Sequence, residues 1–431
     1  MAIRRMIGYS LVLMVMAVMA GCGTTNNNAV EPGNVKKKVT LLHYFSGTLG
    51  GGIQEMVETF NQRNSKYQLV ATPLDHEAYK TSIRDTLASP NSPDLYSYWA
   101  GARTRSVLDN LESFDNVWKT AGLTEDASKA VAEACTHDGK KYIIPVTQHY
   151  VVFFYNKKVF DAAGVRPPST WSEFLRVCER LKASGVTPIA LGAKEKWPAQ
   201  FWFDYLLLYT AGYEYRQQLM EGKASYADAP VRKVFDLWAD AVGKGYFSDR
   251  PIDISWDSGA NEAVYKGEAA MTLMGTWMIG NYSDDHHQWK QGEDYDYFPF
   301  PVMDETMPRY ALGPIDGLVL SKQAVQKDGA KDVLAYLASL DSLKVMSHGS
   351  GAFVPRRVEP EFYSPLQQRM LKDIDAATQW VFNYDLSTPP EVAAAGLNLF
   401  VEFLDFPQQR EHIIMRSAEK IDKIWKKSGA M

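Results

Sequence analysis

Residues 39–60 read VTLLHYFSGTLGGGIQEMVETF, and this stretch decides the fold class. Its first seven residues form a short, mostly apolar run, which is typical of a buried strand in a parallel sheet. The glycine-rich segment 46–52 predicts a turn. After the turn, apolar residues recur at the spacing of an amphipathic helix: Ile53, Met56, Val57 and Phe60. A strand followed at once by a helix indicates the beginning of an α/β fold.

The same alternation continues along the chain. A second strand is expected at 67–72 and a third at 94–99, with a helix between them. A capping box at 170–173 opens another helix, and the last hundred residues are mainly helical. Further strands are expected at 142–146, 151–155, 186–191, 269–273 and 318–321. The pattern predicts an α/β protein of two lobes, each with a mostly parallel sheet flanked by helices.

The composition excludes several classes of protein. The 431 residues allow two or three domains, and 46% apolar with 23% charged residues excludes a mostly disordered or polytopic membrane chain. A net charge of −5 gives no indication of a nucleic-acid partner. Aromatic residues are frequent, at 12% with 11 Trp, and they can form flat ligand platforms as well as cores.

The N-terminus has the layout of a secretory signal. Two arginines precede an apolar run, 11–20, that is too short to span a bilayer. The run ends in Met19-Ala20-Gly21-Cys22, which resembles the lipobox of bacterial lipoproteins, although Met stands where Leu is usual. The resemblance implies that residues 1–21 are a signal peptide and that Cys22 is diacylated. The chain would then lie outside the cytoplasm, anchored to the cell membrane by lipid. The alternative is a secreted protein with an incidental cysteine.

Residues 22–38 are polar, rich in Asn and without a hydrophobic period, which predicts a flexible tether. Two further cysteines follow, Cys135 and Cys178. Because the lobe assignment given below places them in different lobes, we expect both to be free, buried thiols.

Four stretches, in order, resemble the extracellular solute-binding protein family of ABC importers, in the carbohydrate-binding branch that includes maltose-binding protein. The strongest is 265–277 (YKGEAAMTLMGTW), followed by 145–160 (PVTQHYVVFFYNKKVF). The other two are 92–95 (SPDL) and 313–320 (GPIDGLVL). Each motif is weak alone, but four in order, behind a lipobox, are specific.

The resemblance implies a fold in which both lobes are built from discontinuous segments joined by two or three crossover strands. The first lobe would comprise 39–147 plus 316–350, and the second 150–312 plus 352–431. It also implies a receptor without catalysis or cofactor, and we expect the chain to be a monomer. Such a receptor captures a sugar or oligosaccharide in the cleft between the lobes and delivers it to the membrane subunits of an ABC permease.

A sugar presents hydroxyls at its edge and C–H groups on its faces, so its site combines aromatic rings with convergent polar groups. In a doubly wound sheet such a site lies beyond the carboxyl ends of the strands. For His149, Trp197 and Trp277, the resemblance supplies the expected role. The complete set of expected ligand-binding residues is Tyr44, Ser46, Trp99, Arg103, His149, Trp197, Trp277, Asp316, Arg356 and Trp380, with Tyr384 as a further outer platform.

Other interpretations stay open at this point. A lipid-anchored glycoside hydrolase or lyase would need two carboxylates set across a cleft. A receptor that presents its ligand to a sensor kinase would share the fold. An acidic ligand is possible if Arg103 and Arg356 both reach the cleft. Residues 284–287 (DDHH) have metal-ligand types, but with no further ligand in the pattern we expect a solvated loop and no metal.

Overall fold

The computed structural model describes residues 35–428. The chain divides into two units, Met1–Val35 and Lys36–Met431, and the described residues belong almost wholly to the second. The predicted signal peptide, Cys22 and most of the predicted tether lie outside the described residues. Among the helices of the described part, none combines the length and the apolar character needed to cross a membrane.

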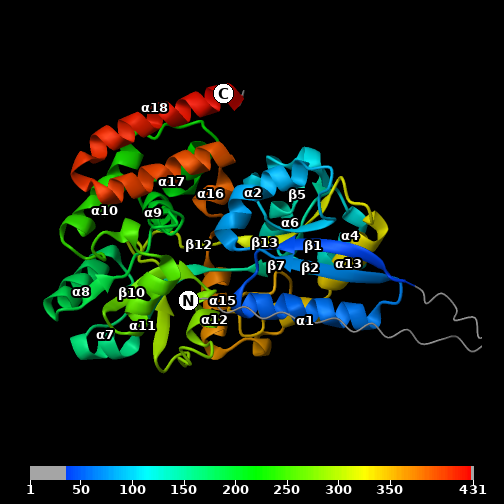
Figure 1. The fold of residues 1–431 in the computed structure, drawn as a ribbon. Coiled ribbons are helices and arrows are strands. Elements are labelled where there is room, and N and C mark those ends of the chain that lie inside the picture. The colour runs from blue at the N-terminus through cyan, green and yellow to red at the C-terminus, as the bar shows by residue number, and fades with distance from the viewer. Residues whose placement is uncertain (1–34, 429–431) are drawn as a thin grey trace, which may run out of the picture. The chain divides into compact units, whose positions relative to one another are not determined.

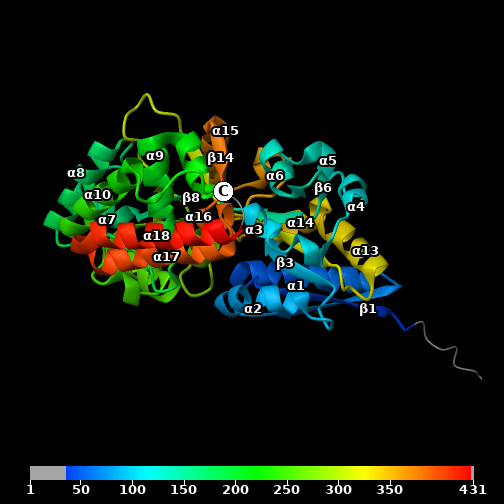
Figure 2. The same ribbon diagram turned by 90° about the horizontal axis from the view of Figure 1, so that it is seen from above.

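The first sheet has six strands in the order β2-β1-β3-β13-β4, with β7 paired to β13. Their bounds are Lys37–His43 (β1), Tyr67–Pro73 (β2), Leu95–Trp99 (β3), Leu111–Glu112 (β4), Ile144–Gln148 (β7) and Ile315–Ser321 (β13). The helices α1 (Gly47–Arg63), α2 (His76–Ala88), α13 (Lys327–Leu337) and α14 (Leu340–Ser347) flank this sheet (Figures 1 and 2). Smaller elements between β3 and β7 are α3 (Ala102–Arg105), α4 (Asp115–Thr120), α5 (Leu123–Asp126), α6 (Lys129–Ala134) and the hairpin of β5 (Thr136–His137) and β6 (Lys140–Lys141).

The second sheet has four strands in the order β11-β8-β10-β9. Their bounds are Val151–Asn156 (β8), Thr187–Ile189 (β9), Ala269–Gly275 (β10) and Tyr295–Phe298 (β11). Its helices are α7 (Lys157–Ala163), α8 (Trp171–Ala183), α9 (Ala199–Met220), α10 (Ala229–Gly243), α11 (Glu262–Tyr265), α12 (Met278–Tyr282), α15 (Pro365–Ala376), α16 (Tyr384–Ser387), α17 (Pro390–Asp405) and α18 (Arg410–Ser428). The last two pack side by side, shown in orange and red in Figures 1 and 2.

The predicted fold class is confirmed, with α/β elements in two lobes, but the sheets are mixed rather than mostly parallel. In the first sheet β1 pairs in parallel with β2 and β3, whereas β13 runs antiparallel to all three of its neighbours. In the second sheet, β10 and β9 form the one parallel pair. The reason is topological: β13 enters its sheet from the opposite end, because the chain arrives there from the second sheet.

The chain passes between the two sheets at three places. The first is His149-Tyr150, between β7 and β8, and the second is Gly313-Pro314, between β12 (Tyr310–Leu312) and β13. The third passes Phe353, whose backbone exchanges two hydrogen bonds with Gln148, at 3.0 and 2.8 Å. The first two crossovers approach so closely that a Cβ on Gly313 would lie 1.7 Å from the carbonyl oxygen of His149. Only glycine fits there.

Local signals in the sequence explain several of these elements. The predicted capping box is present: the Thr170 hydroxyl accepts from the backbone N–H of Glu173, whose side chain accepts from the Thr170 N–H.

Cys135 and Cys178 are both buried and free, as predicted. Burial raises the pKa of the Cys135 thiol to about 12 and raises that of Cys178 further.

Candidate functional site

A cavity of about 370 Å³ lies at the crossovers and is lined from both sheets. Its size suits a small organic ligand. His149, Pro314 and Ser350, at or beside the three crossovers, form part of its wall. Of the predicted ligand-binding residues, seven line this one cavity: Tyr44, Ser46, Trp99, His149, Trp197, Trp277 and Asp316.

One wall is an aromatic pair at the end of the first sheet. Tyr44 follows β1 and Trp99 ends β3, and because these strands run in parallel their carboxyl ends meet at the same edge. The two rings stack with centroids 4.6 Å apart and planes 8° apart. The Arg103 guanidinium lies over the Trp99 ring, 4.7 Å from its centroid. Arg103 is buried and does not line the cavity, so it supports this wall instead of facing a ligand.

The opposite wall is a group of indole rings from the second sheet's side. Trp277, just after β10, lies edge-on to Trp197, with ring centroids 5.8 Å apart. Trp256 packs 5.5 Å from Trp197 and also lines the cavity. A Cβ on Gly275 would lie 2.0 Å from the Trp277 ring, so glycine at this position makes room for the indole. The buried Trp197 Nε1 has no hydrogen-bond partner among the described residues, which leaves a donor for a ligand oxygen.

Asp316 lies where the two walls meet. Its carboxylate accepts hydrogen bonds from the Tyr44 hydroxyl at 2.7 Å and from Thr147 Oγ1 at 2.9 Å. Burial raises the pKa of Asp316, although these two hydrogen bonds oppose the effect. His149 Nδ1 lies 3.1 Å from Thr276 Oγ1, and its ring lies 5.3 Å from the Trp277 ring. Burial lowers the pKa of His149 to about 3, so this imidazole is neutral at physiological pH.

A buried ion pair in the cavity wall was missed by the sequence analysis. Lys80 on α2 and Asp385 on α16 lie 3.0 Å apart, with 15% and 4% of their side chains exposed. Burial alone would raise the pKa of Asp385, but Lys80 and Arg103 together hold it below its ordinary value. Asp385 stands in a four-residue helix without hydrophobic periodicity, so no local pattern marked it.

The charged groups that line the cavity are mostly acidic. Lys80 is its one lysine or arginine. The carboxylates of the lining are Asp75, Glu77, Glu195, Asp257, Asp316 and Asp385. Several of them accept hydrogen bonds from neighbouring protein groups: Glu195, for example, accepts from Ser255 Oγ at 2.7 Å. Such bonds hold the carboxylates in place, and the cavity keeps an acidic lining.

Three predicted residues are not brought to the cavity, besides Arg103. Arg356 is held away from the cavity by Asp126 and by the carbonyl oxygens of Ala121 and Ala338, because its guanidinium finds three acceptors there. Trp380, on β14 (Gln379–Val381), packs against the crossover at Gly313 and lines a different cavity.

Tyr384 is the third. It is fully buried, and its hydroxyl accepts from the Tyr226 hydroxyl and donates to the Val392 carbonyl. The Tyr384 hydroxyl therefore accepts one hydrogen bond and donates another inside the protein. Since the ring is also buried, Tyr384 offers no surface on which a ligand could stack.

The comparisons with known sequences agree with this architecture. The family model of bacterial extracellular solute-binding proteins matches residues 46–342. An uncharacterized ABC transporter extracellular-binding protein of Pyrococcus horikoshii is 27% identical over 378 residues, covering 85% of this chain and 83% of that protein. A "probable sugar-binding periplasmic protein" of Mesorhizobium japonicum is 30% identical over 194 residues, or 44% of this chain and 45% of that protein.

Solved structures share the fold. The bacterial solute receptor AcbH, described as having an exclusive substrate preference for β-D-galactopyranose, superposes with a TM-score of 0.83 at 22% identity, over 90% of this chain and 100% of that chain. A chitin oligosaccharide binding protein gives 0.81 at 21% identity, over 92% and 100%. At these identities the likeness shows the fold alone. Because the family model covers more than half of the sequence, the chain belongs to the bacterial extracellular solute-binding proteins, a family of ligand receptors and not of enzymes.

Proposed function

We propose that this protein is a receptor that captures a carbohydrate in the cavity between its lobes and delivers it to an ABC permease. The observation that carries the proposal is the pairing of the Tyr44–Trp99 wall with the Trp197–Trp256–Trp277 wall across one cavity. The indole rings of the Trp197–Trp256–Trp277 wall can match the C–H faces of a sugar, the stacked Tyr44–Trp99 pair closes the other side, and the Trp197 Nε1 group and Asp316 offer partners for hydroxyls. The names of one relative, a probable sugar-binding periplasmic protein, and of two solved structures, the galactopyranose receptor and the chitin oligosaccharide binding protein, support the same ligand class.

The proposed lobes are 39–147 plus 316–350 and 150–312 plus 352–431, with the ligand held between them. In this arrangement each wall of indole and phenol rings belongs to a different lobe. A ligand favours the closed state only by the contacts that the second lobe adds to those of the first. The proposed working form is a monomer, because each chain carries a complete pair of walls.

The proposed ligand is a neutral sugar. A carboxylate or phosphate on the ligand would meet six acidic side chains and one lysine, and charge repulsion in a buried site costs affinity. The expectation of an acidic ligand rested on Arg103 and Arg356 both reaching the cleft. Neither arginine lines the cavity, so this support for an acidic ligand is absent.

A thermal-shift screen of mono-, di- and oligosaccharides, followed by calorimetry, tests the proposal. We expect at least one neutral sugar to bind with about micromolar affinity, which corresponds to about 8 kcal/mol. The matching uronic acid, with a carboxylate in place of the terminal hydroxymethyl group, should bind at least about tenfold more weakly because of the acidic lining. Tighter binding of the uronate would contradict the neutral-ligand proposal, and no response to any sugar would contradict the carbohydrate assignment.

The proposed membrane attachment rests on the lipobox-like sequence that ends in Cys22. Two acyl chains on one residue suffice for stable anchoring, whereas a single chain does not. We expect the wild-type protein to fractionate with membranes and to partition into detergent, and the Cys22→Ala variant to lose both properties. A Cys178→Ala variant is the matched control, since its thiol is buried in the folded part. Equal fractionation of wild type and Cys22→Ala would exclude the anchor.

A further inference from the structure

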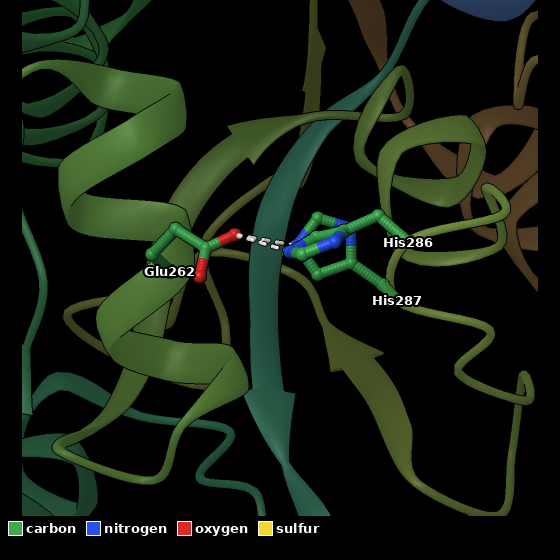
Figure 3. Close-up of side chains that lie close together, drawn as sticks. All are labelled: Glu262, His286 and His287. Carbon is green, nitrogen blue, oxygen red and sulfur yellow. Dashed lines mark hydrogen bonds and ion pairs between the residues drawn. The ribbon is translucent and has the colours of Figure 1, made fainter.

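A second group of polar side chains lies outside the ligand cavity. Glu262 on α11 faces His286 and His287 in the loop that follows α12 (Figure 3). Glu262 Oε1 lies 2.6 Å from His287 Nε2 and 4.0 Å from His286 Nε2. The loop was expected to be solvated, but the side chain of His287 is only 13% exposed. The expectation fails for His287 because Glu262, 25 residues earlier in the sequence, packs against it.

The His287 ring is held in a defined orientation. Its Nδ1 lies 2.9 Å from Asp284 Oδ1, and its ring packs edge-on to Tyr265 at 4.6 Å. The Tyr265 hydroxyl also donates to the backbone carbonyl oxygen of His287, at 3.3 Å. A carboxylate on one ring nitrogen, with the other nitrogen directed at further ligands, is the arrangement that orients histidines in metal sites.

Glu262 and His286 place two further ligand atoms beside His287. Glu262 Oε2 lies 3.5 Å from Lys266 Nζ, which leaves Oε1 directed at the two imidazoles. His286 is 74% exposed, so its ring can adjust without disturbing the core. The three candidate ligand atoms, one from each residue, lie within 4.8 Å of one another.

We propose that Glu262, His286 and His287 form a binding site for a zinc-type divalent cation, with Asp284 orienting His287 from behind. Two imidazole nitrogens and one carboxylate suit Zn²⁺ and its transition-metal neighbours, whereas Mg²⁺ and Ca²⁺ prefer sites built of oxygen alone. Ligand atoms around a tetrahedral zinc lie about 3.3 Å apart, given bonds of about 2.0–2.1 Å. On zinc binding, the 2.6 Å distance from Glu262 Oε1 to His287 Nε2 must lengthen and the 4.0 Å distance from Glu262 Oε1 to His286 Nε2 must shorten, each by less than about 1 Å. Water would fill the fourth position.

The test is calorimetric titration of ZnCl₂ into the mature chain, prepared without a histidine tag and freed of metal with a chelator. We expect saturable binding of one Zn²⁺ per chain, with no comparable heat from MgCl₂. Glu262→Gln, His286→Ala and His287→Ala should each weaken binding by more than about tenfold, and Asp284→Asn by about tenfold as an orienting residue. His348→Ala, which removes an exposed histidine elsewhere, is the matched control and should bind as wild type does.

A second readout avoids the question of whether a variant folds. Co²⁺ added to the wild-type chain should give the intense visible absorption of a four-coordinate site, and Zn²⁺ should abolish it by displacement. Weak binding that does not saturate, binding unchanged in all three ligand variants, or a Co²⁺ spectrum of the hydrated ion would each mean an adventitious ion only, and would overturn the proposal.

Discussion

Trp277→Ala is expected to weaken carbohydrate binding by at least tenfold, or about 1.4 kcal/mol. The Trp277 indole packs against both Trp197 and His149 and lines the cavity, so its loss removes the proposed sugar platform and loosens two further contacts. A stacked ring contributes about 1 kcal/mol beyond its buried area, and the loss of that area adds to this figure. The measurement is calorimetry with the best sugar from the screen.

Trp289→Ala is the matched control for this experiment, because Trp289 is a half-buried tryptophan of the second sheet's side that does not line the cavity. Gly275→Ala supplies a second variant: its Cβ would collide with the Trp277 ring and displace it without deleting it. Binding should weaken in Gly275→Ala and stay within about twofold of wild type in Trp289→Ala. Equal affinities for wild type and Trp277→Ala would remove this residue from the proposed site.

The second large effect is on stability. Asp204→Ala is expected to lower the free energy of unfolding by about 3–5 kcal/mol. Asp204 and Arg216 are both fully buried, and their ion pair measures 2.7 Å. Arg216 Nη2 also donates to the carbonyl oxygen of Phe382, and Asp204 Oδ2 accepts from the backbone N–H of Tyr384, both at short range. Removing the carboxylate leaves the guanidinium buried without its counter-charge. Urea unfolding followed by circular dichroism measures the difference.

The exposed pair of Arg84 and Glu391 provides the control. Its atoms lie 2.9 Å apart, but roughly half of each side chain is exposed, so Glu391→Ala should cost no more than about 1 kcal/mol. A double variant, Asp204→Leu with Arg216→Met, should recover much of the lost stability, because it leaves no unpaired charge. A loss below about 1 kcal/mol in Asp204→Ala would mean that water or another group reaches Arg216.

The predictable parts of the fold are those with a strong local signal. Buried apolar runs such as 151–155 and 269–273 became β8 and β10, because a strand covered on both faces needs an uninterrupted hydrophobic sequence. Tyr44 and Trp99 were placed correctly at the cavity for a related reason. Both stand at the carboxyl ends of such runs, and the carboxyl ends of parallel strands share one edge.

The parts that escaped prediction depend on contacts between distant segments. Lys80 and Asp385 are 305 residues apart in the sequence, and neither lies in a pattern that points to the other. Arg103 was a candidate for the cavity because it follows the third strand outside any hydrophobic period, and Arg356 because it stands near the third crossover. Arg103 packs on Trp99, and Arg356 meets Asp126, 230 residues away. Long side chains of this kind are satisfied by whichever partner the tertiary fold supplies, and a local pattern does not identify it.

The two buried thiols have a practical consequence. Cys135 and Cys178 have raised pKa values, so very little reactive thiolate forms at neutral pH. Maleimide dyes should therefore attach only to cysteines introduced at the surface, provided that the soluble form lacks the N-terminal cysteine. A donor dye on α1 and an acceptor dye on α8 would then report the distance between the halves of the molecule by single-molecule energy transfer, with both native thiols left in place.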